Sequence, residues 1–399
     1  MKSHKLELNL DIQHFDSTGK LKNSYVYPYK ENVENTITFT VKDENNQEVY
    51  NKTFPVRSFV SNWIKVFSST WAANTESVTS PTGSLISLNG LTSNILKINA
   101  LAGDSTYGIW VGNGVVLSSS INSYQILSQV LHGSGSSQCL YKDTTLTPVV
   151  SYGGGYRLVL RREFTNVSGG AINLSTAGLL VKLGTGDIYL GLIDLTDETN
   201  TPIYIPVVNN QTAIVEYHFD ISSSGDYTQN WLKCLYSAFG SASVQMQTTT
   251  YDTVGSQSIV YSNHAYWRGD AGVNVDTWGI VVGSGSGGKD INSYKLSSQI
   301  QQGSGSGQMV YGATTGESVF INAPNAQVAF KRSFTNNSGG ALSISESAIY
   351  MHGAALGGGG FPVDTQDNQK TCVARSVFTA FTVGNGESFQ IRYTSQVTN

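Results

Sequence analysis

Charged residues are scarce in this sequence. Only 13% of its 399 residues are Asp, Glu, Lys or Arg, about half the usual ~25%. The net charge of −4 shows no basic excess, so the composition does not favour nucleic-acid binding. Cysteine is rarer still. Its three residues lack CxxC spacing, which argues against a disulfide framework or a zinc site: Cys139, Cys234 and Cys372.

Long apolar runs are also missing. No stretch of about 18 apolar residues occurs, so we expect no membrane-spanning helix. The N-terminus, Met1 to Phe15, alternates polar and apolar residues and lacks the apolar core of a secretory signal. These absences favour a protein made in a bacterial cytoplasm that needs no oxidation to fold.

What the chain does have is glycine, hydroxyl side chains and aromatics. It contains 42 Gly, 21 Tyr and 15 Phe, and 39% of its residues are apolar. Low charge with many β-branched, aromatic and turn-forming residues is typical of an all-β protein. At roughly 100–200 residues per domain, the length suggests two or three domains.

The strongest pattern is an internal duplication. Several segments recur about 170 residues later, three of them at a constant spacing, which indicates two copies of one structural unit. The repeated pairs are Gly108–Gly112 with Gly279–Gly283, Ile121–Tyr124 with Ile291–Tyr294, Gly133–Ser136 with Gly303–Ser306, and Arg162–Gly170 with Arg332–Gly340.

We therefore predict two homologous units, residues 36–212 and 213–399, after an N-terminal extension of residues 1–35. The boundary is open, because the expected strand at 214–219 could close unit one as readily as open unit two. The predicted fold is mainly β: two tandem β-sandwich-like domains, each with one short packed helix, plus the N-terminal strand.

Each helix is predicted from large apolar residues that recur every four positions, which places them on one face. These are Phe59, Trp63, Phe67 and Trp71 in unit one, and Tyr227, Trp231, Leu235 and Phe239 in unit two. Trp63, Trp71 and Trp231 are accordingly assigned to the core rather than to a sugar-binding platform.

The extension reads as a half-buried strand, because Leu6, Leu8, Leu10 and Ile12 alternate with polar residues. It has no clear equivalent in front of unit two. The strand could cover an edge of unit one, or it could add to the sheet of a neighbouring subunit.

One glycine-rich segment imitates a phosphate-binding loop. Residues Gly283 to Lys289 fit GxxxxGK, but Asp290 stands where Ser or Thr is needed, and no strong helical run follows. We interpret the segment as a flexible loop between strands. The Gly-Ser-Gly-Ser segments are interpreted as turns.

No catalytic, cofactor-binding or metal-binding residue is predicted. No GxSxG elbow lies between a strand and a helix, and none of the six histidines has metal-ligand spacing: His4, His14, His132, His218, His264 and His352. Acidic candidates for a glycosidase pair have no clear counterpart in the other unit: Asp187, Asp194, Asp197 and Glu198. The run from Asp194 to Glu198, which could also be a weak calcium site, fits a solvated loop better. Five N-x-Ser/Thr sequons matter only in a protein secreted by a eukaryote: Asn51, Asn166, Asn173, Asn210 and Asn336.

The order of the repeated motifs resembles a repeat found in virion structural proteins of tailed bacteriophages. The resemblance covers roughly residues 36–399 and rests on turns and strand edges. It implies a component of the particle without saying which. Together with the composition and the missing motifs, it leads us to expect a non-enzymatic structural protein (tail, neck or head-decorating) that binds copies of itself and other virion proteins, with no cofactor, nucleic acid or membrane. The alternatives are a carbohydrate-binding adhesin or receptor-binding protein that uses the loops at 283–290 and 352–362, and a polysaccharide-degrading enzyme.

Overall fold

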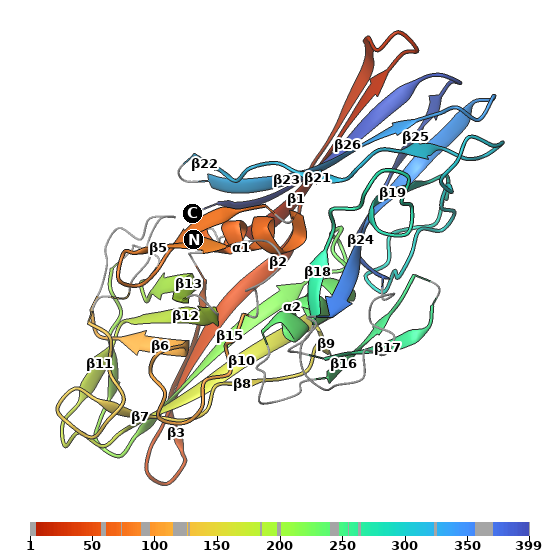
Figure 1. The fold of residues 1–399 in the computed structure, drawn as a ribbon. Coiled ribbons are helices and arrows are strands. Elements are labelled where there is room, and N and C mark those ends of the chain that lie inside the picture. The colour runs from red at the N-terminus through yellow and green to blue at the C-terminus, as the bar shows by residue number, and fades with distance from the viewer. Residues whose placement is uncertain are drawn as a thin grey trace.

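The structure is a computed structural model that describes residues 5–56, 61–72, 74–88, 96–114, 126, 128–183, 186–197, 201–239, 247–253, 255–261, 265–322, 325–355 and 370–398. Of the described residues, 54% lie in strands and 7% in two helices. All the sheets are antiparallel. The prediction of a mainly β protein is confirmed (Figure 1).

The helices are α1 (Ser61–Ala72) and α2 (Gln229–Ala238). The strands, in chain order, are β1 Lys5–Phe15, β2 Leu21–Lys42, β3 Glu48–Pro55, β4 Glu76–Thr79, β5 Leu85–Leu88, β6 Gly108–Gly112, β7 Cys139–Tyr141, β8 Thr145–Leu146, β9 Val150–Tyr152, β10 Gly155–Asn166, β11 Ile172–Leu174, β12 Thr176–Leu183, β13 Gly186–Asp194, β14 Ile205–Val207, β15 Thr212–Ile221, β16 Gln247–Tyr251, β17 Gln257–Tyr261, β18 Ala265–Arg268, β19 Gly279–Gly283, β20 Val310–Tyr311, β21 Thr315–Gly316, β22 Phe320–Asn322, β23 Asn325–Thr335, β24 Leu342–Ala355, β25 Lys370–Val383 and β26 Ser388–Thr398.

One large sheet runs the length of the molecule. Its central path is β20-β23-β26-β1-β2-β15-β10-β7, and β3, β8, β9, β21 and β22 pair along its sides. The two larger of the remaining sheets are β13-β12-β6 from the first half and β18-β24-β19 with β25 from the second, and the other described strands form the pairs β4-β5, β11-β14 and β16-β17. Strands of both halves therefore share one hydrogen-bonded framework. Two separate tandem sandwiches, and the domain limits that go with them, stay a prediction.

The large sheet repeats itself about its middle. In the first half β10 pairs with β15, where Phe164 faces Ala213, and in the second half β23 pairs with β26, where Phe334 faces Phe389. The strand that the sequence left at the boundary therefore lies beside β10, in the position that β26 has beside β23.

Strand β1 lies inside the sheet rather than on an edge. It pairs with β26 along one side and with the first part of β2 along the other. The alternation is confirmed, because Leu6, Leu8, Leu10 and Ile12 are all buried. The expected placement is wrong: both sides of β1 are occupied within its own chain, so it neither covers an edge of unit one nor is free to join a neighbour's sheet.

The structure also reveals a repeat within the first 55 residues. The hairpin β1–β2 and the hairpin β2–β3 have the same turn and end in a bulge at the same position. Asp16 Oδ1 accepts the backbone N–H groups of residues 18 and 20, and Asp43 Oδ1 accepts those of residues 45 and 47, at 2.8–3.0 Å. Gly19 and Asn46 supply the positive φ that each turn needs. The extension thus has a counterpart in residues 36–55, and the two hairpin tips lie at opposite ends of the molecule (Figure 1).

The helices pack on the sheet as predicted. Trp63 stacks on Phe219 of β15 at 5.9 Å, and Trp71 lies 6.2 Å from Phe330 of β23. Phe67 meets Trp231 of α2 at 6.2 Å, so the two helices also contact each other. Phe59, the first residue of the predicted face in unit one, lies outside the described residues. In unit two Tyr227 precedes α2 and Phe239 follows it, and both are buried.

Candidate functional site

A buried arginine anchors each half of the large sheet. Arg162 and Arg332 occupy equivalent positions in β10 and β23, and each is at most 1% exposed. Each guanidinium lies over a tyrosine ring, Tyr141 or Tyr311, at 4.7 and 4.8 Å. Burial lowers the pKa of both arginines to about 10, so both remain charged at neutral pH.

Backbone carbonyls, rather than carboxylates, surround these charges. Arg162 donates to the carbonyl oxygens of Leu101, Asp104, Tyr107, Ile109 and Lys142. Arg332 donates to the matching set of Gly272, Val275, Trp278, Ile280 and Gly312. Because each arginine donates to five backbone carbonyls at once, it ties the loop before β6 or β19 to the sheet.

The other repeated polar residues are also used internally. Asn166 and Asn336 are fully buried, and each side-chain amide donates to two backbone carbonyls at 2.6–2.8 Å. These two sequons are therefore not accessible for glycosylation. Gln138 and Gln308 close the two Gly-Ser-Gly-Ser turns by accepting the N–H of Gly135 and Gly305. The turn assignment is confirmed.

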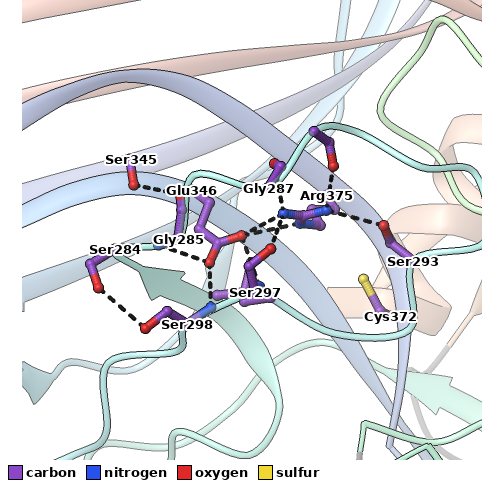
Figure 2. A network of polar contacts seen from close by, with 12 residues as sticks. Ser284, Gly285, Gly287, Ser293, Ser297, Ser298, Ser345, Glu346, Cys372 and Arg375 are labelled. Carbon is purple, nitrogen blue, oxygen red and sulfur yellow. Dashed lines mark hydrogen bonds and ion pairs between the residues drawn. The ribbon is translucent and has the colours of Figure 1, made fainter.

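The segment Gly283 to Lys289 surrounds a buried ion pair that has no counterpart among the repeated motifs. Glu346 of β24 is 0% exposed, and Arg375 of β25 is 6% exposed. Their closest contact is 2.8 Å, from Arg375 Nη2 to Glu346 Oε2 (Figure 2). Figure 2 shows the carboxylate pointing at the loop backbone, where it accepts the N–H groups of Gly285, Ser297 and Ser298 at 2.8–3.1 Å.

Arg375 holds the rest of this loop. Nη1 donates to the carbonyl of Gly288 and to the Ser293 hydroxyl, and Nη2 donates to the carbonyl of Gly287 and to the Ser297 hydroxyl, at 2.7–3.2 Å (Figure 2). Both members of the ion pair therefore hold the segment that the sequence predicted to be a flexible loop: Glu346 binds the N–H of Gly285, and Arg375 binds the carbonyls of Gly287 and Gly288. The signal in the sequence was one acidic residue in the middle of β24 and one arginine in the middle of β25, where the neighbouring residues are apolar or carry hydroxyls.

This arrangement explains why the glycine-rich segment is not a phosphate site. A phosphate loop needs free backbone N–H groups and a free lysine. Here Glu346 already occupies the N–H of Gly285 and of two serines beside the loop. Lys289 contacts the carboxylate of Asp226, which lies just before α2.

The described acidic candidates lie on β13 and in the turn that follows it. Asp187 and Asp194 lie near opposite ends of this extended strand, so they do not converge. Burial raises the pKa of Asp187. Asp197 accepts the N–H of Thr201 in a turn, and Glu198 lies outside the described residues.

The described histidines have separate structural partners. His14 contacts Glu387 at 3.0 Å, His218 contacts Glu216 at 3.6 Å, and His352 packs on Trp278. His132 Nδ1 accepts the Tyr141 N–H, as the Gln302 amide oxygen does for Tyr311. His4 and His264 lie outside the described residues. No group of three or more His, Cys, Asp or Glu among the described residues could hold a metal ion.

A small apolar cavity of about 40 Å³ lies between the two helices. Trp63, Trp71, Trp231 and Trp267 contribute to its walls, and each is less than 10% exposed. The assignment of the helix tryptophans to the core is confirmed. The three cysteines are buried and free. Neither described helix is long and apolar enough to cross a membrane.

The chain was compared with protein-family models, curated proteins and solved structures, and nothing matches in any of the three. Its function therefore has to be argued from its own residues.

Proposed function

We propose that this protein is a non-enzymatic structural component of a bacteriophage particle, placed in the tail, neck or head decoration, that acts through assembly with copies of itself and other virion proteins. The observation that carries the proposal is the use of the repeated residues. Four of these residues donate side-chain hydrogen bonds to backbone carbonyls of other segments and so join those segments: Arg162, Arg332, Asn166 and Asn336. The duplicated residues therefore maintain the scaffold of each half.

The way the chain closes on itself supports this role. Leu6 of β1 pairs with Val397 of β26, so the first and last described strands are neighbours near the middle of the large sheet. A building block used in many copies needs such a rigid framework, and it works by burying surface against its neighbours. We include in the proposal that each half forms a β-sandwich-like unit around its share of the sheet.

Exposed apolar side chains at matching positions supply candidate contact points. Val150 of β9 is 50% exposed, and Phe320, its counterpart in β22, is 57% exposed. Both strands pair with one neighbour in the large sheet, β10 or β23. Matching patches on two halves of one chain would give it two similar surfaces for assembly.

Cryo-electron microscopy of the particle with which the protein co-purifies tests the proposal. Density for the chain in the tail, neck or capsid, with its surface buried against neighbours, is the expected result. A protein absent from the purified particle would sink the proposal.

Binding of a host-surface glycan is the second candidate function. The structure describes the first of the two loops expected to bind the glycan and leaves most of the second outside the described residues. Residues 283–290 carry no aromatic side chain on which a sugar could stack, and residues 356–362 lie outside the description. A glycan-binding screen of the free protein separates this role from assembly, because a structural component is expected to bind none.

A further inference from the structure

Lys289 and Asp226 form the most enclosed lysine contact among the ion pairs of the described residues. Nζ of Lys289 touches Oδ1 of Asp226, and the two side chains are only 20% and 9% exposed. Lys331 and Glu317 form a more exposed lysine–carboxylate pair that serves for comparison. Their Nζ and Oε1 atoms are 3.2 Å apart, and the side chains are 40% and 31% exposed. Lys289 ends the glycine-rich loop, and Asp226 precedes α2, so the contact joins two parts of the second half.

Both partners are held by the same short piece of β25. The Asp226 carbonyl accepts the N–H of Arg375 at 2.8 Å, and its Oδ2 accepts the Ser376 hydroxyl at 2.8 Å. The Arg375 guanidinium holds the carbonyls of Gly287 and Gly288, immediately before Lys289. Two reacting groups fixed in contact have a very high effective concentration, so little entropy is lost on reaction.

The two carboxylate oxygens of Asp226 are in different situations. Oδ2 accepts the Ser376 hydroxyl, whereas Oδ1 is buried and contacts Nζ of Lys289. Keeping two opposite charges buried carries a desolvation cost. Loss of Oδ1 as water would remove both charges and would leave Oδ2 in place as an amide oxygen.

We propose that Lys289 and Asp226 form an intramolecular isopeptide bond between Nζ and Cγ. A proton passes from the lysine ammonium to the carboxylate, and the neutral amine then attacks Cγ. Oδ1 leaves as water with two protons from the original ammonium, so the ion pair becomes a neutral amide plus one water. No oxidant, reductant or activating group is needed for this balance.

Ser376 has a specific part in this step. Negative charge develops on Oδ2 as the amine adds to Cγ, and the Ser376 O–H already points at that atom. The enclosed setting favours proton transfer within the pair, because burial disfavours two separate charges. The bond would cross-link residue 226 to residue 289 and fix the loop to the segment that precedes α2. The inference stands independently of the proposed function.

Mass spectrometry of the folded, purified wild-type chain tests the bond. The expected intact mass is one water below that of the linear sequence, and digestion should give a branched peptide containing both residues. Lys289→Arg keeps the positive charge but removes the attacking amine, and Asp226→Ala removes the carboxyl group that the amine attacks. Both variant proteins should have the full linear mass. The peptides with Lys331 and Glu317 should stay linear in every sample and serve as the internal control.

Formation rate gives a second readout. Ser376→Ala should slow the appearance of the branched peptide in newly made protein by roughly tenfold or more, because one donor to the developing oxyanion is lost. A wild-type chain of full linear mass, whose Lys289 amine still reacts with an acylating reagent after unfolding, would overturn the proposal and leave an ordinary ion pair. A mixture containing the branched peptide supports it.

Discussion

Glu346→Gln is the substitution that most directly tests the role of the buried ion pair. The carboxylate accepts five hydrogen bonds, two from Arg375 and three from backbone N–H groups. An amide keeps one acceptor oxygen but turns an NH₂ donor toward other donors, and it leaves the buried Arg375 charge without a charged partner. Breaking a buried pair in this way costs about 3–5 kcal/mol. We therefore expect the free energy of unfolding to fall by about that amount.

The matched control is Glu317→Gln. Glu317 also accepts from an arginine, Arg392, at 2.8 Å, but both side chains are 31% exposed. A pair this accessible to solvent contributes about 0–1 kcal/mol. Urea unfolding of both variants and the wild type, followed by tryptophan fluorescence, measures the difference. If Glu346→Gln costs no more than Glu317→Gln, the buried pair does not anchor the loop, and the reasoning is refuted.

Three further predictions concern the sheet and its surface. The Lys22 ammonium, the Gly384 N–H and His14 lower the pKa of Glu387 from 4.5 to about 2. A lowered folded-state pKa means that this stabilisation is present above pH 4.5 and is lost as the pH falls toward 2. Glu387→Gln should flatten stability in that window, as seen in urea midpoints against pH, and an unchanged profile would contradict the assignment. Leu10→Ala, in the middle of β1 and 2% exposed, should cost about 2–5 kcal/mol. Leu21→Ala, 51% exposed, should cost well under about 1 kcal/mol, and equal losses in urea unfolding would argue against the central placement of β1. Phe320→Ser should reduce self-association in sedimentation velocity without lowering the melting temperature, and equal association would exclude this contact point.

The repeats show how far local sequence reasoning reaches. Alternating residues in β1 and the four-residue spacing on α1 and α2 concern neighbours in the chain, and both predictions were confirmed. The Gly-Ser-Gly-Ser turns were predicted for the same reason, since a turn depends on a few adjacent residues. None of these patterns carries information about a partner hundreds of residues away.

The sequence did not predict which strands lie beside β1 in the sheet. β1 reads as an ordinary half-buried strand, and nothing in its sequence names β26 as its neighbour. The structure places His14 and Lys22 of the first hairpin against Glu387. At the equivalent turn of the first half Gln211 accepts the N–H of Val208, as Glu387 accepts that of Gly384. The second half therefore carries a charged residue at this turn, and the partners of that charge come from the first hairpin.

The sequence by itself determined the mainly β character, the duplication, the helix faces and the turns, because each depends on composition or on short-range periodicity. Only the tertiary structure decided that both halves share one sheet, that β1 lies inside it, and that Glu346, Arg375, Lys289 and Asp226 meet around one loop. These contacts join residues from 29 to 149 positions apart, and β1 meets β26 across almost the whole chain. Their formation depends on the burial of charge and on strand pairing over the entire fold, which no local pattern encodes.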